Sequence, residues 1–318
     1  MAEQTKIKTS IGGSALIEGI MMRGPQKTTV AVRMADDSIY TEDIEFDAIS
    51  SKGKFFKLPM IRGFVNLIDS LRLSMKCLML SAEKSVEGTE EENEEPSAFE
   101  KWLEDKLGDK LFGVVMTFAT ILGVALSILL FFAFPTFIFN NIAKVAPALD
   151  KGTMWRSVFE GLLKIAIFLG YITIISRTPD MKRTFMYHGA EHKTIFCYEN
   201  LEELTVENVK KYRRFHPRCG TSFMIIMLII GIVIGLFITA KNPLLRTLIK
   251  LLLLPVSCGI GYELIKICAK YDNLATRIIA APGLAAQRIT TIEPDDKMIE
   301  IAIAAIKPVI PENGEDRI

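Results

Sequence analysis

Two long uncharged apolar stretches stand out along this chain. No Asp, Glu, Lys or Arg occurs between Lys110 and Lys144, and residues 111–139 are nearly all apolar. Residues 219–240 are also free of these charges. About 20 consecutive apolar residues are enough for an α-helix to cross the hydrocarbon core of a bilayer. Both stretches therefore predict membrane-spanning helices.

Two further stretches are apolar but carry charges near their ends, where long side chains can reach the bilayer surface. They are residues 155–176, with Glu160 and Lys164, and residues 244–262, with Arg246 and Lys250. Buried helices of a soluble domain are the alternative for this weaker pair. We expect a mainly α-helical, polytopic membrane protein with about four transmembrane helices, and a four-span membrane domain at residues 111–262.

The predicted middle loop, residues 177–221, carries most of the basic residues around the spans. Nine Lys and Arg lie within 177–218, whereas the first loop contains only Lys144, Lys151 and Arg156. Because Lys and Arg are retained on the cytoplasmic side of a membrane, we expect the middle loop to be cytoplasmic. An even number of spans then predicts that both termini are cytoplasmic, and no cleaved signal peptide is visible at the start.

The region before the first span predicts three different pieces. Residues 28–33 and 38–45 are β-branched and alternating around Asp36-Asp37, which indicates a β-hairpin in a small cytosolic β-containing module at residues 1–57. Residues 58–86 have the apolar spacing of an amphipathic helix, which could lie in the bilayer interface or pack on the β module or the spans. Residues 87–110 begin with six glutamates in nine positions and predict a solvated acidic linker.

The segment after the last span, residues 263–318, is expected to be cytosolic. It begins with a short apolar stretch at 274–281, which Pro282-Gly283 should end and which is too short to cross a membrane. The pattern from Asp295 to Lys307 predicts a terminal amphipathic helix that docks on the N-terminal module.

Composition narrows the class of function. Hydrophobic residues make up 50% of the 318 positions and charged residues 24%, with a formal net charge of +1. These values argue against a disordered or collagenous chain and against a partner that is a nucleic acid, and they favour the lipid bilayer as partner. The five cysteines include no CxxC pair, so a secreted disulfide framework is not expected.

The candidate chemistry lies in the middle loop, which holds all three histidines of the chain. His188, Glu191 and His192 form an H-x-x-E-H motif. Residues four apart share one face of a helix, so the two imidazoles could bind one metal ion while Glu191 acts as the general base that activates water. The motif therefore predicts a metal-dependent hydrolase.

A catalytic site of this kind needs a third protein ligand. His216 and Cys219, directly before the third span, are the first candidates for binding a divalent metal, with zinc as the candidate ion. The carboxylate candidates are Glu18, Glu199 and Asp272.

Two other interpretations remain open for the motif. The histidines could form a structural or regulatory metal site, or no metal site at all, in which case Glu191 would pair with Lys193, Arg213 or Arg214. Gly189 lowers helix propensity by about 1 kcal/mol relative to alanine. It could also allow a ligand or the N-terminal loop to approach closely.

A second element with functional character is the glycine-rich run at residues 12–25. Glu18 and Arg23 are charges within its apolar sequence, so we expect the run to line a site and these two residues to take part in catalysis. A turn-rich edge in which Glu18 pairs with Arg23 is the alternative. The run lacks the spacing of a nucleotide-binding loop.

Four motifs together resemble the YqhQ-like family of bacterial membrane proteins: GGSALIEGIMMRGP at 12–25, YHGAEHKTIFCYE at 187–199, RFHPRCGTSF at 214–223 and APGLAAQRITTIEPD at 281–295. The family is described as multi-spanning membrane proteins and predicted metal-dependent enzymes without an established substrate. The resemblance implies a location in the bacterial inner membrane. It also implies a metal, carried by His188, Glu191, His192, His216 and Cys219.

Three functional hypotheses follow. The first is a metal-dependent hydrolase at the cytoplasmic interface, acting on a membrane peptide or a lipid-linked head group. The second is a non-catalytic membrane assembly or regulatory protein in which the same residues form a structural metal site or a polar cluster. A transporter is disfavoured because charges within the spans lie near their ends and no pair of broken helices is evident.

Overall fold

The computed structural model describes residues 6–88, 111–147, 152–240, 242–271 and 273–317. Residues 89–110 of the predicted acidic linker therefore lie outside the described residues. The chain forms two compact units. The first comprises Met1–Gly88, Phe168–Ile230 and Pro255–Ile318, and the second comprises Thr89–Ile167 and Gly231–Leu254.

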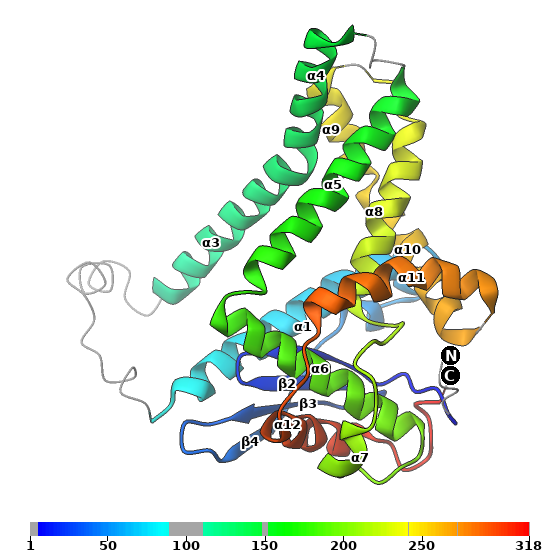
Figure 1. The fold of residues 1–318 in the computed structure, drawn as a ribbon. Helices are drawn as coiled ribbons and strands as arrows, with labels where there is room; N and C mark the ends of the chain where they lie inside the picture. The colour runs from blue at the N-terminus through cyan, green and yellow to red at the C-terminus, as the bar shows by residue number, and fades with distance from the viewer. Residues whose placement is uncertain (1–5, 89–110, 148–151, 241, 272, 318) are drawn as a thin grey trace. The chain divides into compact units, whose positions relative to one another are not determined.

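A four-stranded antiparallel sheet lies at the centre of the first unit (Figure 1). Its strands β1 (Gly12–Leu16), β2 (Gly19–Arg23), β3 (Thr28–Arg33) and β4 (Ile39–Asp43) are arranged in sequence order. The pairing of β3 with β4 confirms the predicted hairpin. The glycine-rich run is a second hairpin, in which Ala15 pairs with Ile20, and its sequence pattern does not predict this hairpin. Strand β2 is buried on both faces and β1 consists mostly of small residues, so neither shows the alternation that identifies a strand.

Helices cover both faces of this sheet. Ile20 and Met22 of β2 point into a core shared with α6 (Pro179–Glu199) and α12 (Asp296–Ile306), whereas Met21 points into the opposite core with α1 (Ile61–Val86). The predicted docking of the terminal helix on the N-terminal module is thereby confirmed. The 58–86 helix packs on the sheet, the second of its two alternatives.

A side-chain cap sets the start of the terminal helix α12. The side chain of Asp295 accepts a hydrogen bond from the backbone N–H of Met298 at 2.9 Å, which starts α12 one residue after the predicted position. Short elements complete the unit: 3-10 turns η1 (Ile49–Ser51), η2 (Lys54–Lys57) and η7 (Lys307–Val309), and helix α7 (Val206–Lys210).

The helix α11 (Leu274–Thr290) corrects the prediction that Pro282-Gly283 ends the apolar stretch at 274–281. The proline lies inside the helix. A Cβ on Gly283 would lie 2.6 Å from atoms of Ser222 in α8 (Gly220–Leu236), so this glycine is where the two backbones come together. Tertiary packing at that contact offsets the hydrogen bond that Pro282 removes from the helix.

The apolar helices give a smaller number of candidate spans than the four expected. Among the described residues, Thr117–Val145 and Thr153–Ile175 are long and apolar enough to cross a membrane. The former joins α3 (Leu111–Ile128), the π-helical turn η5 (Leu129–Ala133) and α4 (Phe134–Val145), and the latter is α5.

The other two predicted spans differ from expectation. Helix α8 has only 17 residues. A third candidate span exists only if the two helices α9 (Pro243–Leu252) and α10 (Leu254–Lys270), which meet at a bend of 44°, form one broken span. The helix breaks between them because the ring of Pro255 does not fit the preceding helical turn.

Two of the charges expected to reach outward from span ends, Glu160 and Arg246, are instead buried in the second unit. Glu160 is 1% exposed and Arg246 is 0% exposed. The Oε2 atom of Glu160 lies 3.2 Å from Nε of Arg246 and also accepts from Lys250, while its Oε1 lies 2.9 Å from Nε of Arg156. The carboxylate is thereby compensated by cations from α5 and α9.

Candidate metal centre

Helix α6 carries His188, Glu191 and His192, and the segment before α8 carries His216 and Cys219. The helix begins at Pro179 after Thr178, because proline at the first helical position loses no intrahelical hydrogen bond. The rings of His188 and His192 lie one turn apart with their centres separated by 4.4 Å. The predicted sharing of one helix face by the two imidazoles is present.

Three side chains have the geometry of a metal-ligand group. One ligand atom each from His188, His192 and Cys219 lies within 4.8 Å of the others. The Nε2 atom of His188 is 3.1 Å from the Sγ atom of Cys219. Two nitrogens and one sulfur form a donor set that suits zinc, and three protein ligands leave a fourth position open.

Backbone carbonyls orient both imidazoles. The Nδ1 atom of His188 lies 2.8 Å from the carbonyl oxygen of Thr290, and Nδ1 of His192 lies 2.5 Å from that of Arg214. A carbonyl can only accept, so each Nδ1 carries the proton and donates it. Each Nε2 atom is then the one available to a metal, as in many metal sites. The sequence does not predict these partners, because every residue has a backbone carbonyl and none carries a sequence signal.

Charge coupling favours the thiolate form of Cys219. Burial acts to raise the pKa of this thiol, but the neighbouring imidazoles of His188 and His192 outweigh it and lower the pKa well below its ordinary value. Burial likewise acts to lower the pKa of His188, whereas the sulfur of Cys219 raises it to about 9. The thiolate is the form that binds metals.

Two glycines let backbone segments approach the cluster. A Cβ on Gly189 would lie 2.1 Å from the carbonyl oxygen of Ile292, whose own N–H donates to the carbonyl of Phe185 at 2.9 Å. A Cβ on Gly13 would lie 3.0 Å from the carboxyl carbon of Glu191. The segment after α11 therefore makes the close approach at Gly189, and the N-terminal hairpin makes one at Glu191.

Glu191 is buried beside the three ligand side chains, with 5% of its surface exposed. The backbone N–H of Gly13 donates to its carboxyl group, while Oε2 has no hydrogen-bond partner among the described residues. Burial raises the pKa of Glu191, and the two histidines of its helix oppose this rise. The carboxyl group lines a cavity of about 330 Å³ together with the three ligand residues and the hairpin backbone. An unpaired buried oxygen next to a nitrogen and sulfur donor set fits a bound cation.

His216 lies close to this group but outside it. Its ring centre is 5.5 Å from that of His192, and its Nε2 atom is 3.9 Å from Oε2 of Glu199. The side chain of Gln287 holds its backbone, accepting from the N–H and donating to the carbonyl, both at 2.7 Å. Burial lowers the pKa of His216 to about 4, which keeps the ring neutral at physiological pH.

The two remaining catalytic candidates lie away from the cluster. Glu18, in the turn between β1 and β2, forms a two-pronged ion pair with Arg183, each contact 2.5 Å long, and accepts from the hydroxyl of Tyr187 at 3.1 Å. The alternative pairing of Glu18 with Arg23 is therefore wrong. Arg23, at the end of β2, lines a different cavity.

Other carboxylates also have their own partners. Glu199 pairs with Arg218 and accepts from the backbone N–H of Thr9 at 2.9 Å. Two of the three cations expected as partners of Glu191 in a metal-free cluster are engaged elsewhere, since Lys193 and Arg214 both contact Glu293. Asp272 lies outside the described residues.

Comparison with known proteins gives a family without an assigned activity. The family described as "Protein of unknown function (DUF1385)" matches residues 58–312. "Uncharacterized protein YqhQ" of Bacillus subtilis (strain 168) is 32% identical over 311 residues, which cover 96% of this chain and 93% of the relative. No solved structure gives a significant match. The resemblance drawn from the four motifs is thereby confirmed at the level of the family.

Proposed function

We propose that this chain, which belongs to the DUF1385 family, is a membrane-associated, metal-dependent hydrolase whose metal is held by His188, His192 and Cys219. The observation that carries the proposal is the orientation of the two imidazoles. Carbonyl oxygens occupy both Nδ1 positions, while the Nε2 side of the pair meets the thiol. Such outer partners fix the tautomer and the ring direction of metal-binding histidines.

Glu191 would be the general base. A divalent ion, with zinc the best match to this donor set, would supply Lewis-acid activation of a carbonyl or phosphoryl group and lower the pKa of water. Burial raises the pKa of the Glu191 carboxyl group above its ordinary range, and a carboxyl group with a raised pKa suits proton uptake and return. The N–H of Gly13 holds the carboxyl group in place, and the cavity beside it offers room for a reacting group.

The membrane part of the proposal is supported by the two or three helices that are long and apolar enough to span. We infer a multi-pass protein of the bacterial inner membrane with its termini and the metal cluster on the cytoplasmic side. The basic middle segment supports that orientation. A membrane peptide or a lipid-linked head group would be the substrate.

A non-catalytic role is the second candidate, and one observation favours it. The hydrogen bonds of the cluster join α6 to the segments at Arg214 and Thr290, and the 3.1 Å contact between His188 and Cys219 is itself a hydrogen bond. A structural metal site or a polar cluster would hold these segments together in the same way.

Metal analysis, together with a substitution that removes the general base, distinguishes the hydrolase from the non-catalytic role. We would purify the protein in detergent without chelators, measure bound metal by elemental mass spectrometry, and assay hydrolysis of a panel of ester, amide and phosphoester substrates. We expect about one ion per chain, and its loss in a His188→Ala, His192→Ala double variant. Metal-free parent protein would refute the metal centre.

Glu191→Gln should keep the metal and the fold and abolish hydrolysis, because the amide cannot accept the proton. Glu202→Gln is the matched control, since that carboxylate is exposed shortly after the end of α6. Unchanged hydrolysis in Glu191→Gln would rule out its role as base. A metal-loaded parent that cleaves no member of the panel would favour the structural role.

A further inference from the structure

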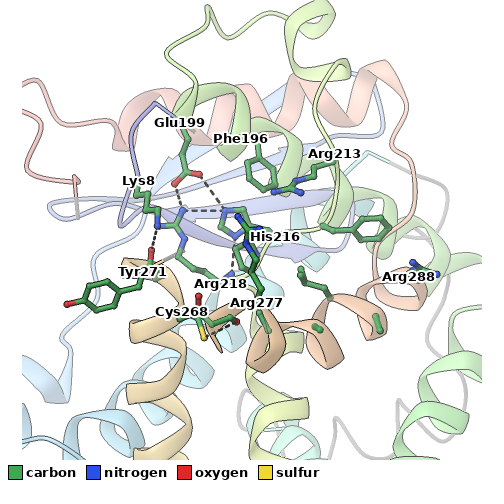
Figure 2. Close-up of a pocket in the computed structure, with 18 residues that line it drawn as sticks. Lys8, Phe196, Glu199, Arg213, His216, Arg218, Cys268, Tyr271, Arg277 and Arg288 are labelled. Atoms are coloured by element: carbon green, nitrogen blue, oxygen red, sulfur yellow. Dashed lines mark hydrogen bonds and ion pairs between the residues drawn. The ribbon is translucent and has the colours of Figure 1, made fainter. Parts of the chain in front are cut away.

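A second, larger cavity in the first unit lies between α11, the segment at 213–218 and Lys8 (Figure 2). Its volume is about 630 Å³, in the range of small-molecule sites. The metal-centre proposal does not use it. Two residues, His216 and Arg218, line both this cavity and the smaller one beside Glu191. The two cavities are therefore neighbours that share a wall.

The charge of the larger cavity is strongly biased to one sign. Its lining contains the five basic residues Lys8, Arg213, Arg218, Arg277 and Arg288. Among the described residues, Glu199 is the single carboxylate of that lining, and its charge is matched by the ion pair with Arg218. An excess of fixed cations around a concave surface attracts and retains anions. Guanidinium groups in particular match the geometry of phosphate oxygens.

Aromatic and cationic groups are combined at one side of this cavity. The guanidinium carbon of Arg213 lies 5.0 Å from the centre of the Phe196 ring, and Phe215 lines the cavity nearby. Figure 2 shows Arg288 on the same side as Arg213 and Lys8 on the opposite side. Stacking on Phe196 limits the motion of Arg213, so less conformational entropy is lost when its N–H donors bind a ligand.

The remaining wall is apolar and belongs to α11. Ala281 and Leu284 lie between Arg277 and Arg288 at the spacing that puts all four on one helix face. The apolar surface continues along the helix outside the cavity, where Leu274 is 75% exposed and Ile278 is 63% exposed. An inorganic anion would leave this surface uncovered, whereas an acyl chain would cover it.

We propose that this cavity binds a lipid with an anionic, phosphate-bearing head group, with its acyl chain along the apolar face of α11. Arg213 and Arg288 bind the phosphate, and Ala281 and Leu284 contact the chain. The proposal that a lipid binds here depends only on the lining of this cavity and not on the metal centre. Its further role, holding the substrate beside the cluster of His188, His192 and Cys219, rests on the proposed function.

Direct binding measurements on the purified full chain test the site. The probes are dioleoyl phosphatidic acid, dioleoyl glycerol, dioleoyl phosphatidylcholine and inorganic phosphate, each added to the protein in a neutral detergent and followed by native mass spectrometry and by competition with a fluorescent phosphatidic acid. Phosphatidic acid should bind most tightly. Equal binding of dioleoyl glycerol or phosphatidylcholine, or inorganic phosphate competing as well as the lipid, would overturn the proposal.

Two substitutions locate the binding. Arg288→Glu is exposed and should fold, and with Arg213→Glu it should weaken phosphatidic acid binding by about ten-fold or more. Lys182→Glu, an exposed lysine of α6 outside the cavity lining, is the control and should leave binding unchanged. If the double variant unfolds on heating at a much lower temperature, the single Arg288→Gln variant replaces it. Unchanged binding in the folded variants would overturn the proposal.

Measuring the metal content of the same samples distinguishes a failure of the lipid-site proposal from a failure of the hydrolase proposal. The arginine variants should retain the metal of the parent while losing the lipid. Arginine-dependent lipid binding by a parent protein without metal would leave this site standing and refute the metal centre. A metal-loaded, hydrolytic parent that does not bind phosphatidic acid would refute this site alone.

Discussion

The Nε2 atom of His188 lies 3.1 Å from the Sγ atom of Cys219, although 31 positions separate the two residues in the chain. The contact joins the middle of α6 to the residue before α8. Gln287 of α11 stabilises the segment that carries Cys219. Its side chain forms hydrogen bonds with the backbone of His216 and the hydroxyl of Ser222. The cluster is therefore preorganised by three helices, which is the arrangement that a metal site on rigid elements requires.

Replacing the sulfur ligand should weaken metal binding far more than replacing another buried cysteine. Cys219→Ser is expected to lower the metal affinity by about 100-fold or more, because a serine hydroxyl is not ionised at neutral pH and binds zinc poorly. Competition with a chromogenic chelator measures the affinity. Cys197→Ser on α6 is the control, since this thiol donates only to the carbonyls of Glu202 and Glu203. Equal metal loss in both variants would contradict the assignment of Cys219.

Removing the metal should lower the thermal stability of the protein. A ligand that binds only the folded chain stabilises it by RT ln(1 + L/Kd), where L is the free ligand concentration, so the stabilisation grows with the metal concentration relative to the dissociation constant. Dialysis against a chelator is expected to lower the melting temperature, and adding back zinc should restore it. The His188→Ala, His192→Ala double variant should show no such response. A melting temperature that does not depend on chelator or zinc in the parent would argue against a bound metal.

Adding one methyl group at Gly189 should disrupt the contact between α6 and the segment after α11. A Cβ there would lie 2.1 Å from the carbonyl oxygen of Ile292. We expect Gly189→Ala to lower the free energy of unfolding by about 2 to 3 kcal/mol, as overpacking of a core does. Chemical denaturation in detergent gives the value. Gly231→Ala in α8 is the control, because no atom lies within 4 Å of its Cβ. A stabilised Gly189→Ala would show that this approach is not close.

Asp69 should make stability depend on acid pH. Its carboxylate accepts from the backbone N–H groups of Ile49 and Ser50 at 2.9 and 3.0 Å. Burial acts to raise its pKa, but these donors outweigh burial and hold the pKa below its ordinary value of 3.8. The folded chain therefore holds this proton less tightly than the unfolded chain. The stabilisation is present above pH 3.8 and is lost as the pH falls through the folded-state pKa.

The substitution Asp69→Ala tests this linkage. It should cost about 2 to 3 kcal/mol near neutral pH, because two charge-assisted hydrogen bonds are lost. The deficit relative to the parent should shrink at acid pH. Asp47→Ala, whose side chain is 71% exposed and pairs with Lys52, should have little effect at any pH. A deficit that stays constant with pH would contradict the expected ionisation.

Neutralising Glu160 should destabilise the second unit. Its removal leaves Arg246, which is fully buried, and Lys250 without their shared carboxylate. Breaking a buried pair by removing one partner costs about 3 to 5 kcal/mol. Thermal unfolding of Glu160→Gln in detergent measures the loss. The matched control is Glu300→Gln, which removes an exposed carboxylate paired with Arg33 and should cost under about 1 kcal/mol. Similar melting temperatures for the two variants would contradict the result expected for Glu160.

Much of the local structure could be read from the order of the residues. The hairpin at β3 and β4 and the helix α12 follow from periodicity and capping within a few residues, and each was predicted within one or two positions. The sharing of one face by His188 and His192 follows from the pitch of a helix alone. Local backbone geometry decides features of this kind, so no knowledge of distant segments is needed.

Only the tertiary structure selected Cys219 as the third member of the group and left His216 beside Glu199. Tertiary packing also decided that Glu18 pairs with Arg183 and that α11 continues past Pro282. The choice between two side chains three residues apart depends on how α6, α8 and α11 pack, because each helix fixes the direction of the others. The carbonyls of Arg214 and Thr290 that orient the imidazoles belong to the backbone, which is the same at every residue. Sequence therefore determined which residues could bind a metal, and packing decided which of them meet.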